Sequence, residues 1–423
     1  MNRRPRSRKT LPLPVALSTA AGVLVVSLWA SGAPSMVYPL LADRWRVGEV
    51  VTTALFATYP VALVLALVAC GSLSDSIGRR RVLLAGVGMV AVGTALFVVT
   101  SGLVPIFIGR TLQGLGVGIA MSAASAALIE FAPRRTAALS TSVNTAATAS
   151  GTALALVVGG ALVQYSALPT TFPFAILLGV TIALLPLVWF LPEEATRSNV
   201  RWRPSRVRAP ARTRMQFAIG VASLTVAFMM GAVFIGLGAQ IVRDLVGTVD
   251  AFVAACALAC WAVAIVPASI IARRGSPTSA SLAGSVLSAT GSVTLVAAAN
   301  VDLLTVFLLA AVISGVGYGL MFYGGLGMVV AASEAETRAA TLSLMYLVAY
   351  LSQSLTAVGI GALATFWGLD RAIVVAMPTL QHSVSRAGCW FTGSHDRELT
   401  SDWPAERRTD ATPGGYALLP SRA

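Results

Sequence analysis

Long apolar runs dominate the chain and limit the folds that are open to it. Eleven runs approach or exceed the roughly 20 residues that an α-helix needs to cross the hydrocarbon core of a bilayer. Only 11% of the 423 residues are charged, whereas a soluble domain is closer to a quarter charged. The sequence therefore predicts an all-α polytopic membrane protein, with spans over residues 15–41, 50–70, 82–99, 103–129, 137–163, 172–191, 217–242, 251–272, 279–299, 303–332 and 341–367.

The basic residues collect on one side of these spans. One side receives 20 Arg and Lys, and the other receives four. Because loops rich in Arg and Lys stay in the cytoplasm, we expect a cytoplasmic N-terminus (1–14) and a multi-pass protein of the cell membrane. The first run is too long for a cleaved signal peptide, so we expect it to be retained. The net charge of +13 resides in short gaps between apolar runs, so we expect no nucleic-acid partner.

Two segments of the chain recur about 200 residues apart. RRTAALS (134–140) returns as TRAATLS (337–343), with an offset of 203 residues. GLGVGIAM (114–121) returns as GVGYGLMF (315–322), with an offset of 201. An internal repeat of this length predicts two related halves, as in transporters that bind their substrate between parallel repeats.

The boundaries of these halves follow from composition. Residues 193–214 are rich in Arg and Pro and predict a cytoplasmic linker between an N-terminal six-helix half (15–192) and a C-terminal half (215–377). A twelfth helix is missing or degraded, because only six consecutive apolar residues (372–377) precede a polar tail over 378–423, which we expect to be disordered. An altered reading frame or a truncation would explain this, and would leave an inactive transporter as one alternative.

The connection between the second and third runs is GSLSDSIGRRR (71–81). It resembles the cytoplasmic signature of the major facilitator superfamily, Gly-x-Leu-x-Asp-x-x-Gly-Arg-Arg/Lys. RTLQGLGVG (110–118) and APSMVYP (33–39) are similar to two further elements of that family, and the resemblance covers residues 15 to about 367. The matching residues of the loop are Gly71, Leu73, Asp75, Gly78, Arg79 and Arg80.

The resemblance implies two pseudo-symmetric six-helix halves that rock about a central substrate, and a conformational switch in this loop. Asp75 would lie at the positively charged start of the helix near Ala339 and favour the state that is closed inside. Arg79 would pair with an acidic residue on the fourth span, for which Glu130 is the candidate. The residues assigned to the switch are therefore Gly71, Asp75, Gly78, Arg79, Arg80 and Glu130.

One element departs from the pattern of bacterial drug/proton antiporters. Those proteins carry a glycine–proline pair on the fifth helix, where this chain has Ala155 and Leu156. The departure weakens the expectation of antiport and leaves the resemblance to the family unchanged.

Arg110 lies seven residues inside the fourth span, where a charge costs at least ~2.5 kcal/mol unless it is paired or hydrated. In a structural interpretation, its side chain snorkels to the membrane surface or binds carbonyls of the first span near Pro34 and Pro39. In a functional interpretation, it faces a central cavity and acts on a proton or substrate. The family resemblance favours the second interpretation.

Few polar side chains remain to line a cavity. Besides Arg110, the residues assigned to transport and coupling are Gln113, Asn144, Tyr318 and Gln353, with Gln240, Tyr323 and Tyr350 as further cavity-lining candidates. Without a buried acid, such a cavity suits a small apolar or amphipathic molecule. The four cysteines are scattered and both histidines lie in the tail, so we expect no metal site, no cofactor and no enzymatic activity. We also expect the protein to be a monomer. Proton-coupled efflux is the preferred function, with metabolite uptake and a membrane sensor as alternatives.

Overall fold

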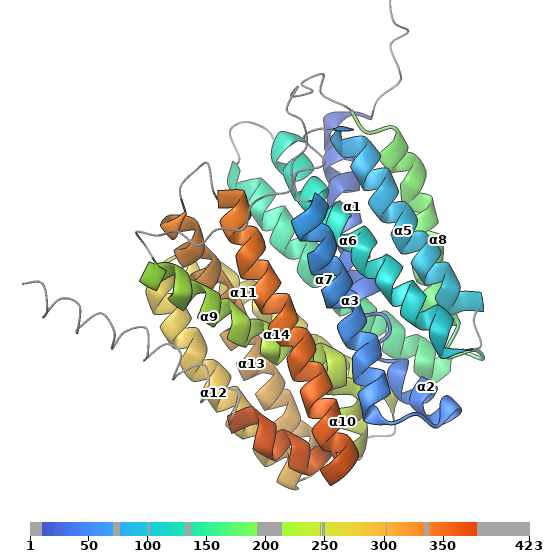
Figure 1. Cartoon of the computed structure of the whole chain (residues 1–423), viewed down its shortest axis with the longest axis vertical. Helices are drawn as coiled ribbons and strands as arrows, with labels where there is room; N and C mark the ends of the chain where they lie inside the picture. Colours follow the sequence, from blue (N-terminus) through green and yellow to red (C-terminus); the bar gives the residue numbers. More distant parts are fainter. Residues whose placement is uncertain are drawn as a thin grey trace, which may run out of the picture.

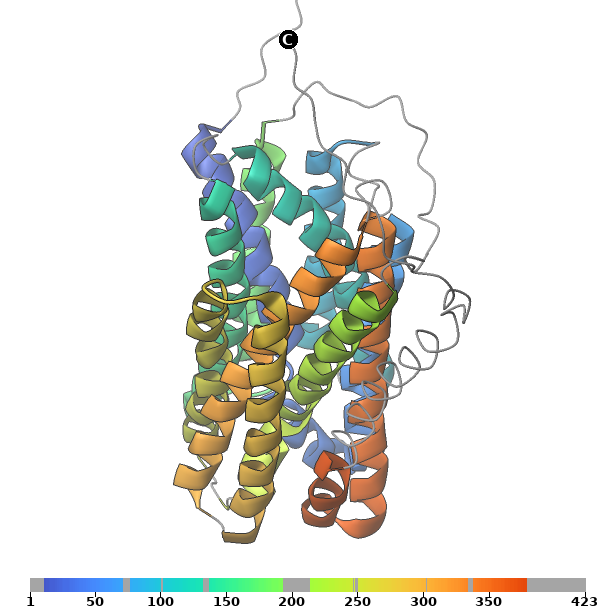
Figure 2. The same ribbon diagram turned by 90° about the vertical axis from the view of Figure 1, so that its left-hand side faces the viewer.

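The computed structural model describes residues 11–70, 77–99, 102–131, 137–192, 214–245, 247, 250–301, 303–333 and 338–378. Within these ranges the secondary structure is entirely helical, and the long helices run roughly along the long axis of the bundle (Figures 1 and 2). Among these described residues, eleven helices are long and apolar enough to span a membrane, which confirms the eleven predicted spans. The switch residues Gly71 and Asp75, the linker (193–213), and residues 1–10 and 379–423 lie outside the described part.

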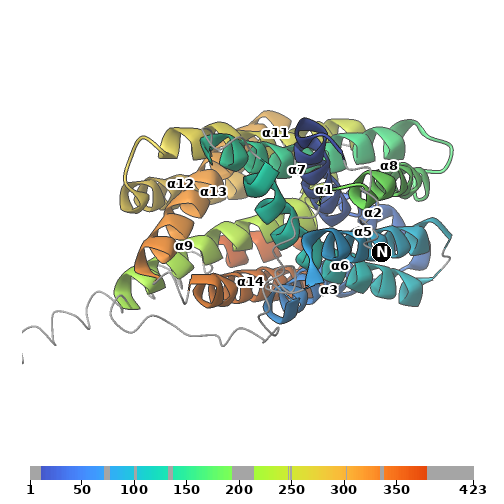
Figure 3. The same cartoon turned by 90° about the horizontal axis from the view of Figure 1, so that it is seen from above.

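The helices form two halves that lie side by side (Figure 3). The first half contains α1 (Leu13–Gly32), α2 (Tyr38–Trp45), α3 (Glu49–Cys70), α5 (Arg79–Val99), α6 (Leu103–Phe131), α7 (Ala137–Tyr165) and α8 (Phe172–Trp189). The second contains α9 (Arg214–Gly231), the π-helix η1 (Ala232–Leu237), α10 (Gly238–Leu245), α11 (Ala251–Ala272), α12 (Pro277–Val301), α13 (Leu304–Ala332) and α14 (Arg338–Trp367).

Hydroxyl groups inside these helices bond to their own backbone. Ser27 donates to the Val23 carbonyl at 2.7 Å, and Thr181 donates to the Leu177 carbonyl at 2.7 Å. Because lipid offers no hydrogen-bond partner, a spanning helix must satisfy its polar groups internally. These i−4 bonds allow apolar helices to carry Ser and Thr without exposing a polar group.

The internal repeat extends to matching contacts between helices. A Cβ atom on Gly114 of α6 would overlap the carbonyl oxygen of Tyr59 on α3, and a Cβ atom on Gly315 of α13 would overlap the carbonyl oxygen of Trp261 on α11. The two glycines are 201 residues apart and their partners 202. Small residues at both positions allow the backbones to approach closely in lipid, so both halves are built around the same helix crossing.

The two halves meet along two helix pairs, α3 with α14 and α7 with α11 (Figure 3). Gly361 of α14 packs on Thr53 of α3, and Gly160 of α7 packs on Ala255 of α11. We name the ends of the bundle after the residues that begin two antiparallel helices, the Glu49 end (start of α3) and the Arg79 end (start of α5). All four residues above lie toward the Glu49 end, so the halves pack most closely there.

A short helix over 369–378 follows α14, after Gly368 with a φ of 85° (Figure 2). Its apolar side joins the core of the second half through Leu369, Ala372, Ile373, Ala376 and Met377. Ten helical residues rise about 15 Å, which is half the hydrocarbon thickness. The described residues therefore contain no twelfth span, as the hydropathy of this segment predicts.

The first span differs from its prediction. Residues 15–41 were expected to form one helix, but α1 ends at Gly32 and α2 begins at Tyr38, with turns between them. Pro34 lacks the N–H group that would continue the helical hydrogen-bond ladder, whereas Pro39 lies in the first turn of α2, where proline is tolerated. Hydropathy predicted the length of the span but not this break.

Candidate functional site

The predicted switch is described only in part. Gly78 has a φ of 95°, a left-handed conformation that glycine adopts without strain, and it directly precedes α5. Arg79 forms an ion pair with Glu130 at the end of α6 and donates to the Ala126 carbonyl at 3.3 Å. Arg80 is half-buried on the first turn of α5. The pairing of Arg79 with Glu130 agrees with the sequence analysis, and its role as a switch stays a prediction.

Arg110 is fully buried, with an exposed fraction of 0%. Its Nη1 atom donates to the Ala30 carbonyl at 3.2 Å, to the Ser31 carbonyl at 3.5 Å and to Gln113 Oε1 at 3.1 Å. Its Cζ atom lies 4.5 Å from the centre of the Tyr59 ring. Each of these partners is formally neutral, and the Nε atom has none.

The break at Pro34 explains these contacts. In a continuous helix, the Ala30 carbonyl would accept a hydrogen bond from the nitrogen of residue 34, which proline cannot donate. The Ser35 amide bonds the Gly32 carbonyl instead of the Ser31 carbonyl. Arg110 therefore supplies donors to two carbonyls that the break leaves without a helical partner. The structure shows the carbonyl-binding arrangement that the sequence analysis ranked second; any role of Arg110 in coupling stays a prediction.

Two other assigned residues of the first half bind neighbouring helices. Gln113 is fully buried and donates to Thr94 Oγ1 on α5 at 3.1 Å. Asn144 on α7 is half-buried and donates to Ser125 Oγ on α6 at 3.1 Å. Gln113 thus belongs to the buried Arg110 network, whereas Asn144 is separate from it.

The interior of the second half is aromatic. Phe228 contacts every other ring of a group that we call the Phe228 cluster, drawn from α9, α13 and α14. Its centroid lies 4.7 Å from the Tyr350 ring and 6.3 to 6.5 Å from the other three. The four tyrosine and phenylalanine partners are all half-buried. The members of the cluster are Phe228, Tyr318, Phe322, Tyr346 and Tyr350.

Gln353 lies beside this cluster, one turn after Tyr350 on α14. It is 8% exposed, and its Nε2 atom would lie 3.3 Å from a Cβ atom placed on Gly231. Its amide has no hydrogen-bond partner among the described residues, in contrast to Gln113. The structure therefore brings two assigned residues, Tyr318 and Gln353, together beside Gly231 in the second half, whereas Arg110 belongs to the first.

The cluster carries no acid. Residues 214–231, 304–332 and 338–367, which include α9, α13 and α14, contain neither Asp nor Glu. A cation in the middle of a span costs at least ~2.5 kcal/mol, and a cation–π contact returns ~0.5–2 kcal/mol. Because the cost of burying a cation exceeds the cation–π energy, uncharged groups are favoured beside these rings.

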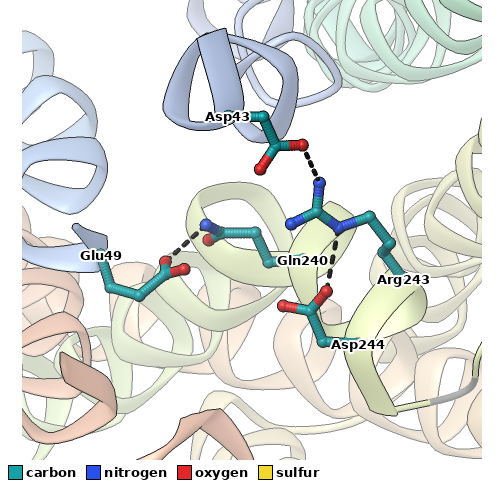
Figure 4. Close-up of polar contacts among 5 residues, drawn as sticks. All are labelled: Asp43, Glu49, Gln240, Arg243 and Asp244. Carbon is teal, nitrogen blue, oxygen red and sulfur yellow. Dashed lines mark hydrogen bonds and ion pairs between the residues drawn. The ribbon is translucent and has the colours of Figure 1, made fainter. Parts of the chain in front are cut away.

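A polar contact between the halves lies at the Glu49 end (Figure 4). Glu49 of α3 accepts a hydrogen bond from Gln240 of α10. Arg243 of α10 bridges Asp43 of α2 at 2.8 Å and Asp244 at 2.9 Å. We call these five residues the Glu49 latch. Gln240 is almost fully buried, whereas the Arg243 pairs are exposed to solvent, so the Glu49–Gln240 bond is the more protected contact.

The sequence analysis did not identify this latch. It placed Gln240 among cavity-lining residues, whereas the side chain lies at the end of the bundle against Glu49. Arg243 was counted only among the basic residues of the loops, and Asp43 was given no role. Their common signal was opposite charge at the ends of the first and seventh predicted spans, which fall on the same side of the membrane.

Two solved structures share the fold over most of the chain. A bacterial homologue of the human lysosomal transporter Spinster, in an inward-facing, unoccupied conformation, has a TM-score of 0.73 at 14% identity, covering 93% of this chain and 99% of that one. A mutant of the nucleoside transporter NupG has a TM-score of 0.73 at 10% identity, covering 90% and 100%. Identities this low establish the fold alone.

Curated relatives match shorter segments. An uncharacterized MFS-type transporter, EfpA, of Mycobacterium tuberculosis is 35% identical over 136 residues, 31% of this chain and 24% of the relative. A tetracenomycin C resistance and export protein of Streptomyces glaucescens is 26% identical over 188 residues, 44% of this chain and 35% of the relative. The matched segments thus span a quarter to a third of these relatives.

The family assignment rests on a longer match. The sequence profile of the Major Facilitator Superfamily matches residues 20–357, which include nine complete spans and most of the first and eleventh among the described residues. The same region holds the repeated helix crossings, the Arg79–Glu130 pair and the aromatic cluster. The chain therefore belongs to the Major Facilitator Superfamily, and it is a multi-pass membrane transporter rather than an enzyme.

Proposed function

We propose that this secondary transporter moves a small apolar or amphipathic molecule out of the cell, driven by protons. The observation that carries the proposal is the interior of the second half, where the Phe228 cluster and the unpartnered amide of Gln353 lie on helices without an acidic residue. Such a surface stacks with apolar groups and offers few hydrogen bonds. A sugar, which needs many hydrogen bonds, would be poorly matched.

The contacts between the halves support alternating access. Four hydrogen bonds between described residues join the halves, and they lie in the part of the bundle nearer the Glu49 end. If the excess of Arg and Lys marks the cytoplasmic side, the Arg79 end faces the cytoplasm and the Glu49 latch holds the outer end closed. The four hydrogen-bonded pairs are Asp43 with Arg243, Glu49 with Gln240, Gln164 with Ala251, and Ala57 with Ser354.

The direction of transport is supported by the relatives. The Streptomyces glaucescens protein is named for resistance and export of tetracenomycin C, and 44% of this chain aligns with it. Metabolite uptake is a second candidate, because Ala155 and Leu156 replace the glycine–proline pair of drug/proton antiporters.

Accumulation in cells separates these candidates. Cells that express the full chain are loaded with neutral and cationic fluorescent aromatic compounds, with and without a protonophore. Export predicts lower accumulation than in cells carrying an empty vector, and loss of the difference when the protonophore is added. Higher accumulation would support uptake, and a difference that survives the protonophore would refute proton coupling.

A further inference from the structure

The rings of the Phe228 cluster have a defined mutual orientation. Phe228 lies at 31° to Tyr318 and 21° to Phe322, and the last two rings lie at 10° to each other, with centroids 6.1 to 6.3 Å apart. Tyr350 meets Phe228 edge-on, at 84° and 4.7 Å. The Tyr318 and Phe322 rings are nearly parallel and half-buried, whereas the Phe228 ring that packs against both is only 5% exposed. Flat aromatic molecules stack favourably on such a surface and meet a ring edge beside it.

Unused hydrogen-bonding groups lie next to these rings. The Gln353 side chain is 8% exposed and can donate two hydrogen bonds and accept others, yet it has no partner among the described residues. Trp261, whose ring lies 5.2 Å from Tyr318, has a buried Nε1–H group that also lacks one. Buried polar groups are normally paired, and an unpaired one is destabilising. A ligand acceptor would remove that penalty at Trp261, and the Gln353 amide can both donate to and accept from the same ligand.

Charge limits the ligand further. The helices that carry the cluster have no acidic residue over 214–231, 304–332 and 338–367. Among the described residues, the buried cation Arg110 of the first half binds formally neutral groups alone. A cationic ligand would find ring faces but no carboxylate in this interior.

We propose that the Phe228 cluster and Gln353 form a subsite for flat, uncharged polycyclic aromatic ligands that carry both a hydrogen-bond acceptor and a donor. The ligand stacks on Tyr318 and Phe322, which Phe228 supports from behind, and bonds to the Gln353 amide. This inference rests on the proposed function, because it names the substrate class for the same interior.

Three tricyclic probes of similar size test the proposal. Acridone is neutral with one N–H and one carbonyl, 9-aminoacridine is a cation at neutral pH, and anthracene has no polar group. Binding to the purified full-length chain in lipid nanodiscs is measured by ligand fluorescence, with empty nanodiscs subtracted. We expect saturable acridone binding at least about tenfold tighter than that of the other two, corresponding to about 1.4 kcal/mol.

Two variants locate the site. Gln353→Leu should weaken acridone binding about tenfold and leave anthracene binding unchanged, because only acridone uses the amide. Phe322→Leu should weaken both probes, because it removes a stacking face while keeping an apolar side chain. Gln216→Leu and Phe366→Leu, at exposed positions on α9 and α14, are matched controls that should behave as wild type.

The ligand series refutes the proposal even if a variant fails to fold. Equal or tighter binding of 9-aminoacridine, equal binding of anthracene, or no saturable acridone binding by the wild type would each overturn it. A folded Gln353→Leu protein with unchanged acridone affinity would do the same. Because binding is measured without a gradient, a chain that binds acridone but exports nothing contradicts only the proposed function, whereas export without acridone binding contradicts only this inference.

Discussion

Restoring a backbone donor at residue 34 should make Arg110 partly dispensable for stability. Arg110→Leu leaves the Ala30 and Ser31 carbonyls buried without their donor, at a cost of about 1–3 kcal/mol for each unsatisfied group. The same substitution removes a buried cation, which returns part of that cost. The net effect of the single variant is therefore a poor measure of the contact, and a double-mutant cycle is needed to isolate it.

Pro34→Ala supplies the missing N–H group. The preceding residue, Ala33, is helical (φ −52°, ψ −39°), which directs the nitrogen of residue 34 toward the Ala30 carbonyl. In the Pro34→Ala background, Arg110→Leu should therefore cost about 1–3 kcal/mol less than in the wild type. Pro39→Ala is the matched control, because the carbonyl four residues before it belongs to Ser35, whereas Arg110 binds those of Ala30 and Ser31.

The cycle is measured by unfolding the four proteins in mixed micelles of dodecyl maltoside and SDS, followed by tryptophan fluorescence. Independent sites add within about 0.5 kcal/mol. A coupling energy inside that range for the Pro34 pair, or one of equal size for the Pro39 pair, would refute the argument that Arg110 replaces the donor that Pro34 removes.

Three further outcomes follow from contacts described above. Glu49→Gln keeps a hydrogen-bonding group but loses the charge, so the latch should stabilise the closed outer end by about 1 kcal/mol less. The rate at which cysteine thiols react with a reagent added on the outer side should then increase several-fold. Arg79→Ala and Glu130→Ala should be less than additive in unfolding free energy, and additive costs would show that the ion pair contributes nothing. Gly114→Ala should destabilise by about 1–3 kcal/mol through overlap with α3, whereas Gly88→Ala, with open space around it, should be neutral or stabilising, as thermal unfolding would report.

The parts of the fold that depend on local composition could be predicted from the sequence. Hydropathy over about 20 residues predicted eleven spans, and the recurrence of GLGVG as GVGYG (114–118 and 315–319) predicted two related halves. The matching contacts of Gly114 and Gly315 agree with that repeat. Arg79 was paired with Glu130 because the family resemblance implies such a pair and the two residues lie on the same side of the membrane.

Features that depend on single hydrogen bonds or on contact between the halves could not be predicted. A hydropathy average does not register the N–H group that Pro34 removes, so the first span was expected to be continuous. The Glu49–Gln240 contact joins residues 191 positions apart, and no local pattern reports how the two halves pack. Gln240 was therefore assigned to a cavity because of its polarity alone.

The helices α9, η1 and α10 form one continuous helical segment. Along it, the π-helix η1 lies between Phe228 of the aromatic cluster and Gln240 and Arg243 of the Glu49 latch. Its i→i+5 hydrogen bonds accommodate about one residue more than the same stretch of α-helix. With 3.6 residues per turn, conversion of η1 to α-helical bonding would rotate everything that follows by about 100° about the helix axis. Gln240 and Arg243 would then turn away from Glu49 and Asp43 without any sliding of α9. A shift of one residue in the helical register beside Gly231 is thus geometrically sufficient to break the contacts of Gln240 and Arg243 that close the Glu49 end.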